Sequence, residues 1–304
     1  MTTVAFSWEG TCVAGRVGQS IGAALHAAGV TQLSTSEQDH RPRGLYCCAG
    51  VCSSCTVTVD GLSGVAACTT PLVGGEVVGC NDGRPGRCAT AGGFEERAVD
   101  VLVVGAGERG LSAAIERARG GRRVVCVDRD HEAGGWLLAT SGGRDRRDPL
   151  VAAARAAGVE LLLQSTVLAS YDDDVVGVVA PAGLVAVAAA ELIVEAGWYE
   201  RGLAFANNDL PGVMLAAGAQ RMLVRDGVRC GSRVVVATDE PFGADVADLL
   251  RDVGATVEVV AAADVEIAHG TSAIEAVTVA GRRIPCDSLL IAVGRRPADE
   301  LVRT

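Results

Sequence analysis

Aromatic side chains are scarce in this chain of 304 residues, where Phe, Trp and Tyr together make up 3%. So few rings leave little to stack on nucleic-acid bases. Positive charge is also in deficit, because 27 basic residues face 37 acidic ones and the formal net charge is −10. Proteins that bind nucleic acid need a basic face for the phosphates. We therefore expect no nucleic-acid partner.

Long apolar runs and a targeting segment are missing as well. The longest uncharged run, 175–190, is too short for a membrane span and is interrupted at Pro181. We expect two strands joined by a turn there, and no transmembrane segment. The first residues, MTTVAFSWEG, lack a signal-peptide pattern and read as a strand. Together with an odd number of cysteines, eleven, this favours the cytoplasm over a secreted disulfide scaffold.

A site able to oxidise a substrate is not visible either. The four histidines are dispersed and pair with no nucleophile or metal-ligand set. Flavoprotein disulfide reductases carry a Cys pair after the second strand of the nucleotide fold, but this chain has Trp136 and Leu137 there. The later part of the chain holds only the isolated Cys230 and Cys286. We therefore predict no catalytic residues in this chain.

The chain does contain a regular set of cysteines in GLYCCAGVCSSC, residues 44–55, followed by Cys68. Their spacing is C-x4-C-x2-C and then a fourth Cys after twelve residues, which is typical of a plant-type 2Fe-2S cluster with a shortened last interval. Small residues between them let backbone amides turn toward the sulfides. A zinc site and a group of buried thiols are the alternatives, but zinc usually needs two C-x2-C pairs and one is present. The predicted ligands are Cys47, Cys52, Cys55 and Cys68.

The surrounding residues predict a β-grasp ferredoxin-like domain over 1–79, with a strand pair turning at Asp60-Gly61. Cys48 follows a ligand directly, so it is expected to pack or face solvent, with a role as an alternative ligand left open. Residues 80–98 are rich in Gly and charge and predict a linker, in which Cys80 and Cys88 are spectators. Arg41 and Arg43, with Cys48, form a candidate surface for a partner protein.

From residue 99 the pattern changes to that of a dinucleotide-binding domain, predicted over 99–205. A buried strand leads into GxGxxG, a helix, and a second strand that ends in an acid 23 positions after the first Gly. The glycines allow a tight turn, close approach to a pyrophosphate and close helix packing, while the acid accepts from ribose hydroxyls. Two further glycines would pass beneath the cofactor. The predicted cofactor-binding residues are Gly105, Gly107, Gly110, Asp128, Gly134 and Gly135.

A second strand, turn, helix and strand follows over 206–290, but without the glycines. Ala237 and Asp239 stand where the first two are expected, and Phe242 stands where the third is expected. We therefore interpret this second Rossmann-type unit as structural rather than as an NAD(P)H site. Residues 291–304 are predicted to return to the first nucleotide domain. The fold class is α/β: a ferredoxin-like domain followed by a flavin-reductase-like pair of Rossmann-type units.

The chain resembles the electron-transfer and nucleotide-binding subunits of heteromeric amine and amino-acid dehydrogenases. These include the sarcosine oxidase alpha subunit, opine oxidase, hydrogen cyanide synthase and the proline or hydroxyproline dehydrogenase complexes. The resemblance rests on RPRGLYCCAGVCSSCTVTVDG, on ACTTPLVGG, and most specifically on NDLPGVM at 208–214. IAVGRRP at 291–297 is similar to the late strand of flavin reductases. One departure is Glu195-Ala196-Gly197, where many relatives have ATG beside the flavin.

The resemblance implies an oxidoreductase subunit that relays electrons from the flavin of a partner subunit through a 2Fe-2S cluster. The implied substrates of the complex are amines or amino acids of the sarcosine, proline, opine or glycine type. The partners would be catalytic flavoprotein subunits. The nucleotide at the glycine turn would be FAD, with NAD or an adenine nucleotide as alternatives. A self-contained NAD(P)H-dependent reductase and a non-catalytic assembly subunit remain open as other functions.

Overall fold

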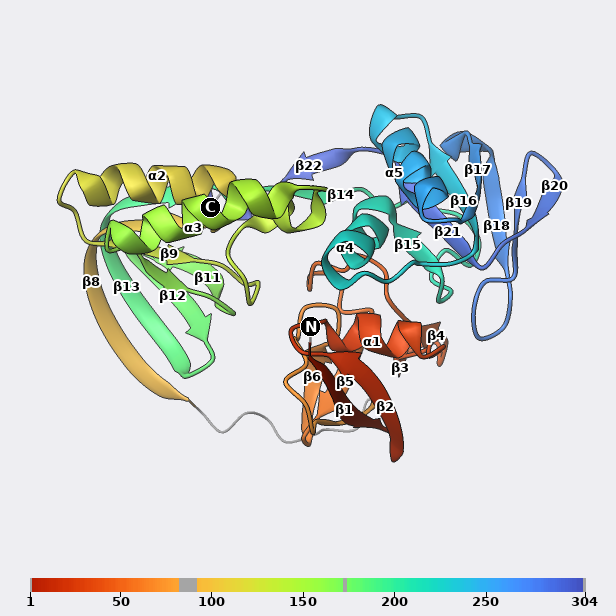
Figure 1. The fold of residues 1–304 in the computed structure, drawn as a ribbon, viewed down its shortest axis with the longest axis horizontal. Coiled ribbons are helices and arrows are strands. Elements are labelled where there is room, and N and C mark those ends of the chain that lie inside the picture. Colours follow the sequence, from red (N-terminus) through yellow and green to blue (C-terminus); the bar gives the residue numbers. More distant parts are fainter. Residues whose placement is uncertain (1, 82–91, 172–173, 303–304) are drawn as a thin grey trace. The chain divides into compact units, whose positions relative to one another are not determined.

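The computed structural model describes residues 2–81, 92–171 and 174–302 (Figure 1). Its contacts divide the chain into two compact units. Unit 1 combines Met1–Cys88 with Glu200–Arg295, and unit 2 combines Ala89–Tyr199 with Arg296–Thr304. Among the described residues, no helix is both long and apolar enough to cross a membrane.

The first part of unit 1 is a mixed five-stranded sheet with one helix, as the sequence predicted. Helix α1 (Ile21–Ala27) is capped by Ser20, whose hydroxyl accepts from the Ala23 N–H. The sheet order is β2-β1-β7-β5-β6, and a two-stranded sheet, β3-β4, lies apart from it. The strands are β1 (Thr3–Trp8), β2 (Thr11–Arg16), β3 (Ser34–Thr35), β4 (Pro42–Arg43), β5 (Thr56–Val59), β6 (Leu62–Ala66) and β7 (Val77–Cys80).

The predicted turn between β5 and β6 is present. Asp60 and Gly61 have φ angles of 50° and 82°, the left-handed conformations that two-residue hairpin turns require. Antiparallel pairing on either side of this turn brings Thr56 opposite Ala66. The hairpin therefore places Cys55 and Cys68, which flank the two strands, at the same end of the pair.

The second part of unit 1 is the expected second Rossmann-type unit. Its parallel sheet has the order β15-β21-β16-β17, and a separate antiparallel sheet has the order β18-β19-β20. The elements are β15 (Val213–Leu215), α4 (Ala216–Asp226), β16 (Arg233–Thr238), α5 (Pro241–Asp252), β17 (Thr256–Val260), η2 (Ala262–Asp264), β18 (Val265–His269), β19 (Ala276–Val279), β20 (Arg282–Pro285) and β21 (Ser288–Ala292).

These two parts of unit 1 share a hydrophobic core. One cluster of buried side chains includes Leu25 and Leu72 from the ferredoxin-like part together with Met214, Met222 and Leu250 from the second part. Burial of apolar surface is the main driving force for packing. The ferredoxin-like part is thus joined through its core to a segment more than a hundred residues later in the chain.

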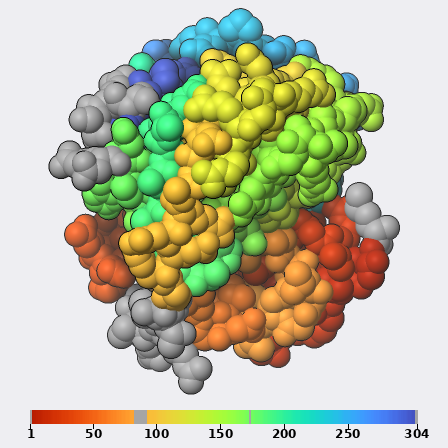
Figure 2. Space-filling model, turned by 90° about the vertical axis from the view of Figure 1, so that its left-hand side faces the viewer, coloured from red at the N-terminus to blue at the C-terminus, as the bar shows by residue number. Residues whose placement is uncertain are grey.

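Unit 2 contains a six-stranded sheet of order β10-β9-β8-β13-β12-β11. Helices α2 and α3 pack against each other and are visible side by side on its surface (Figure 2). The elements are β8 (Gly93–Val104), α2 (Glu108–Arg119), β9 (Val124–Val127), η1 (Gly135–Ala139), α3 (Gly143–Ala156), β10 (Glu160–Leu162), β11 (Thr166–Tyr171), β12 (Val175–Ala180) and β13 (Gly183–Val194).

The predicted linker at 80–98 is wrong at both ends. Cys80 ends β7, and β8 begins at Gly93, six residues before the predicted nucleotide domain. The error has a physical cause, because the first residues of β8 are charged and exposed, and pairing with β13 holds them in the sheet. Residues 82–91, including Cys88, lie outside the described residues.

The predicted return segment at 291–304 also begins too early. Ile291 lies in β21, at the centre of the unit 1 sheet, where it pairs with β15 and β16. The chain changes units within β22 (Arg295–Pro297), which pairs with β14 (Trp198–Glu200), and a short helix η3 (Glu300–Val302) follows. Apolar residues in a buried parallel strand and in a returning strand look alike in sequence.

Glu200, the first residue of the second part of unit 1, is a buried carboxyl beside α4. Its Oε2 accepts from the backbone N–H of Ala217 at 2.8 Å, while no described group hydrogen-bonds its buried Oε1. Burial raises the pKa of this carboxyl to about 7, although the Ala217 hydrogen bond and the charges of Arg295 and Arg221 oppose the shift. The ionised form is therefore disfavoured near neutral pH.

We expect Glu200→Gln to stabilise the protein at pH 8 and to have little effect at pH 5. The pKa of the carboxyl is 4.5, its ordinary value, in the unfolded chain and about 7 in the folded protein, so the folded state binds the extra proton between these values. Stability then falls as the pH rises through this window, by on the order of 1–3 kcal/mol. Urea unfolding at both pH values measures the effect, and equal changes at pH 5 and pH 8 would contradict the explanation.

Candidate cluster and dinucleotide sites

The four cysteines with the predicted cluster spacing meet in unit 1. Cys52 and Cys68 donate to the sulfur of Cys47, and Cys68 also donates to Cys55. These contacts lower the pKa of the accepting thiols, Cys47 and Cys55, and raise the pKa of the donating thiols, Cys52 and Cys68. No three His, Cys, Asp or Glu side chains are arranged for a single metal ion in the part of the chain that the structure describes.

Backbone amides of the loop point at these sulfurs. The N–H of Ala49 lies 3.4 Å from the sulfur of Cys47, the N–H of Val51 also donates to it, and the N–H of Ser54 donates to Cys52. The loop reaches this shape through left-handed residues, among them Cys48 at φ 47° and Ser53 at φ 56°. Four thiols within a ring of amide donors suit an anionic cluster held by thiolates.

Of the predicted partner surface at Arg41, Arg43 and Cys48, the structure contradicts the part at Cys48, and it gives both arginines a partner within the chain. Both guanidinium groups pair with the carboxylate of Asp209 from the second part of unit 1, Arg41 at 2.7 Å. Cys48 is 3% exposed and packs in the shared core, where burial raises the pKa of its thiol. The two positive charges therefore join two segments of this chain.

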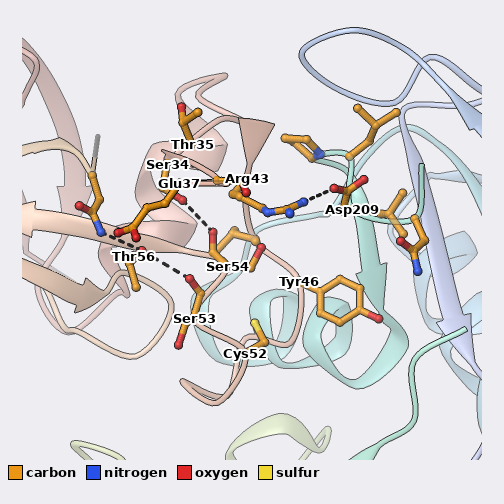
Figure 3. Close-up of a pocket in the computed structure, with 18 residues that line it drawn as sticks. Ser34, Thr35, Glu37, Arg43, Tyr46, Cys52, Ser53, Ser54, Thr56 and Asp209 are labelled. Atoms are coloured by element: carbon orange, nitrogen blue, oxygen red, sulfur yellow. Dashed lines mark hydrogen bonds and ion pairs between the residues drawn. The ribbon is translucent and has the colours of Figure 1, made fainter. Parts of the chain in front are cut away.

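Cys52 is the most accessible of the four cysteines. Cys47, Cys55 and Cys68 are 5%, 2% and 2% exposed, whereas Cys52 is partly exposed. It lines a cavity of about 520 Å³ together with Tyr46, Ser54 and the Arg43–Asp209 pair (Figure 3). Burial raises the pKa of the Tyr46 phenol to about 12. No pattern in the sequence points to this cavity, because its walls come from segments far apart in the chain.

In unit 2 the predicted glycines of the nucleotide turn lie together. Gly105 has a φ of 104°, and a Cβ there would overlap the backbone of Glu195. A Cβ on Gly110 would overlap the carbonyl of Gly105, so this glycine lets α2 approach the strand. Gly107 is different, since the nearest heavy atom to a Cβ there is 4.0 Å away. Of these three glycines, only Gly107 borders open space.

The second glycine pair crosses this turn. The N–H of Gly134 donates to the Ala106 carbonyl at 2.8 Å, and a Cβ on Gly135 would be 2.9 Å from the Cα of Gly107. Glu108, the acidic residue beside the turn, pairs with Arg146 of α3. Its charge is therefore offset by an arginine of the same unit.

Asp128 directly follows β9 and lies next to the turn, at the position that the fingerprint predicted. Its Oδ2 accepts from the Ala106 N–H at 2.7 Å and its Oδ1 from the Asp130 N–H at 2.9 Å. Burial raises the pKa of this carboxyl, and the two backbone donors oppose the shift. Each oxygen keeps acceptor capacity for a ribose hydroxyl. Asp128 and Gly105 line a second cavity, of about 480 Å³, whose other walls include β11, Tyr199 and η3.

The second Rossmann-type turn is shifted by one residue from the predicted alignment. Helix α5 begins at Pro241 after Glu240, as α2 begins at Glu108 after Gly107. The counterparts of Gly105, Gly107 and Gly110 are therefore Thr238, Glu240 and Gly243, and the placement at Ala237, Asp239 and Phe242 was wrong.

The shifted alignment keeps one glycine and replaces two. A Cβ on Gly243 would overlap the Thr238 side chain, so close helix packing is retained. The Thr238 hydroxyl accepts from the Glu240 N–H at 3.0 Å and donates to the Ala292 carbonyl at 2.8 Å. The Thr238 hydroxyl thus closes the turn by hydrogen bonds within the chain. The turn also places the Glu240 carboxylate beside the start of α5, where its negative charge disfavours a pyrophosphate.

Of the other described thiols, Cys126 lies against the nucleotide turn, where its sulfur donates to the Gly105 carbonyl at 3.7 Å. Burial raises the pKa of Cys230 and of Cys286 to about 12, which agrees with inert core thiols. Cys80 lies in β7.

Two protein families match this chain. Residues 1–83 match the 2Fe-2S iron-sulfur cluster binding domain, and residues 100–157 match the FAD binding domain. Both predicted cofactors, the 2Fe-2S cluster and FAD, are therefore supported, and FAD is favoured over NAD or an adenine nucleotide.

Several curated proteins that are similar to this chain in sequence are named as oxidase subunits. The sarcosine oxidase alpha subunit of Corynebacterium sp. (strain P-1) is 37% identical over 225 residues, covering 66% of this chain and 23% of the relative. The protein of the same name from strain U-96 is 31% identical, covering 86% and 30%. An opine oxidase subunit of Agrobacterium tumefaciens (strain Ach5) is 30% identical, covering 51% and 35%. The chain spans at most about a third of these proteins.

Solved structures share the fold. L-proline dehydrogenase from P. horikoshii aligns with a TM-score of 0.84 at 22% identity, covering 99% of this chain and 62% of that chain. Thioredoxin reductase from Lactococcus lactis aligns with a TM-score of 0.53 at 17% identity, covering 67% and 80%. The α/β fold class is confirmed. The chain belongs to the family of the sarcosine oxidase alpha subunits, with a 2Fe-2S domain followed by an FAD-binding domain.

Proposed function

We propose that this protein is the electron-transfer subunit of a multi-subunit, flavin-dependent dehydrogenase or oxidase that acts on an amine or amino acid of the sarcosine, proline, opine or glycine type. A catalytic flavoprotein partner would bind and oxidise the substrate. The observation that carries the proposal is the convergence of Cys47, Cys52, Cys55 and Cys68 in a chain whose relatives are named as oxidase subunits.

The chain's own residues would perform three tasks. Cys47, Cys52, Cys55 and Cys68 would hold the 2Fe-2S cluster, which supplies one-electron transfer when bound. Gly105, Gly107 and Gly110 would receive the FAD pyrophosphate, with Gly134 and Gly135 crossing beneath. Asp128 would accept from its ribose. Cys52 is the accessible ligand beside the 520 Å³ cavity, so electrons would enter or leave the cluster on its side.

We also propose that the protein works in the cytoplasm, where thiols stay reduced. Cys47, Cys48, Cys52, Cys55 and Cys68 are thiols that take part in no disulfide. A self-contained NAD(P)H-dependent reductase is less well supported, because Thr238 and Glu240 replace glycines in the second turn.

The test is purification of the native complex from its source, with identification of its chains, visible spectrum and released nucleotide. We expect a second flavoprotein chain, cluster absorption and FAD. The isolated chain should not oxidise sarcosine, proline or opines. Anaerobic NADH should leave its cluster and flavin bands unbleached, and rapid bleaching would favour the self-contained reductase instead.

Cys52→Ser is expected to abolish or strongly diminish the cluster signal, because a serine hydroxyl replaces one of four thiolate ligands. Cys48→Ser is the matched control, being the adjacent thiol that packs in the core, and should retain the cluster. Iron content and the electron paramagnetic resonance (EPR) spectrum of the reduced protein measure both. Cluster loss in Cys48→Ser with retention in Cys52→Ser would reverse the ligand assignment.

Gly107→Ala is expected to reduce FAD affinity by about tenfold or more without unfolding the protein. Among the described residues outside its two chain neighbours, the nearest heavy atom to a Cβ there is 4.0 Å away, so we expect the added methyl group to clash with a bound ligand. Gly110→Ala is the contrasting variant, since its Cβ would overlap the Gly105 carbonyl and should lower the melting temperature even without FAD. Unchanged FAD binding by a folded Gly107→Ala protein would place the pyrophosphate elsewhere.

A further inference from the structure

Helix α4 of the second Rossmann-type unit lies directly against the cysteine loop. The N–H of Leu215 donates to the Tyr46 carbonyl at 3.0 Å. A Cβ on Gly218 would lie 2.9 Å from that oxygen and 3.0 Å from the Cys47 carbonyl oxygen. The two backbones therefore touch, and side chains farther along α4 are carried toward the rest of the loop.

Two arginines of α4 reach the loop. Arg221 donates from Nη1 to the Cys48 carbonyl at 3.2 Å, and Arg225 donates from Nη2 to the Cys68 carbonyl at 2.9 Å. Residues four apart lie on one face of a helix, so both guanidinium groups face the cysteines. One contacts a predicted ligand residue, and the other contacts the neighbour of Cys47.

Arg225 is a buried charge. Its side chain is 2% exposed, as is that of Asp226, whose Oδ2 lies 3.3 Å away. The Asp226 carboxylate also accepts from the N–H and hydroxyl of Ser20, at 3.0 and 3.1 Å. Burying a cation costs free energy unless it is paired and hydrogen-bonded. This cation is held in place by Asp226 and by the backbone of a cysteine residue.

We propose that Arg221 and Arg225 are positioning residues that raise the reduction potential of the cluster held by the four cysteines. The inference rests on the proposed function, because it needs the cluster at Cys47, Cys52, Cys55 and Cys68. Reduction adds a negative charge, and a fixed positive charge nearby stabilises the reduced form most where water is excluded. The second Rossmann-type unit then serves the cluster rather than a nucleotide.

The two arginines contribute unequally. Asp226 offsets part of the Arg225 charge, so loss of Arg225 removes one half of an ion pair and also disturbs the contact with Ser20. Arg221 donates to the Cys48 carbonyl at the surface of α4 and is partly exposed. Arg221 is therefore the cleaner position for a test, and Arg225 is the position where structural loss is expected as well.

The experiment is an EPR-monitored redox titration of the full chain with its cluster reconstituted, comparing wild type, Arg221→Gln, Arg221→Lys and Arg225→Gln. In Arg221→Gln we expect the ratio of reduced to oxidised cluster at a fixed potential to fall about tenfold, which for one electron is a shift of about 59 mV to lower potential. Arg221→Lys keeps the charge and should restore most of the potential. Arg225→Gln should shift the same way with a lower melting temperature.

Arg251→Gln is the control, because it also removes one positive charge from unit 1, at an exposed position of α5 that pairs with Asp248. It should leave the potential unchanged. Equal potentials in wild type and Arg221→Gln, with the cluster intact, would overturn the inference, as would an equal shift in Arg251→Gln. If Arg225→Gln does not fold, the comparison of Arg221→Gln with Arg221→Lys is sufficient to test the inference. A wild-type chain that takes up no cluster would instead overturn the proposed function.

Discussion

The backbone of α4 meets the backbone of the cysteine loop at Gly218, and the arrangement of unit 1 depends on this contact. A side chain at Gly218 would push the helix away from Tyr46 and Cys47. The close approach lets the helix bury apolar side chains such as Met222 in the core that also contains Leu25. At the end of the helix, the buried carboxylate of Asp226 holds the residue that caps α1. The backbone contact at Gly218, the shared core and the buried carboxylate of Asp226 therefore all hold helix α4 in place.

The two Rossmann-type turns share one glycine position and differ at the other two. Helix packing on the strand requires a glycine in both turns, at Gly110 and Gly243, because a Cβ would overlap the residue at the start of the turn. The other glycines of the first turn are those predicted to serve the ligand or the tight turn. In unit 1 a threonine hydroxyl replaces the first of them and closes the turn by hydrogen bonds to Glu240 and Ala292. A structural requirement has thus been retained while the positions that would admit a phosphate have changed.

The sequence predicted features that depend on local spacing and missed those that depend on distant packing. The cysteine pattern, the Asp60-Gly61 turn and the first GxGxxG turn each need residue types at fixed intervals, and the structure has the turns and brings the cysteines together. The charged start of β8 looked like a linker because only its pairing with β13 makes it a strand. The pairing of Arg43 with Asp209 was missed for a similar reason, since Asp209 lies 166 residues away. The one-residue error at Thr238 arose because the strand end carries no glycine to mark it.

Unit 1 is assembled from two segments separated by the whole of the FAD-type domain, and this has a consequence for the cysteine loop. The loop is walled by α4 and by residues around Asp209, so residues 1–83 alone would leave apolar and charged groups without their partners. A ferredoxin-like segment that depended on its own core could be exchanged freely between proteins. Here the core is shared, so a change in the second Rossmann-type unit is also a change in the surroundings of the cysteines. That dependence gives the second unit a structural role, although Thr238 and Glu240 stand where a nucleotide-binding turn has glycines.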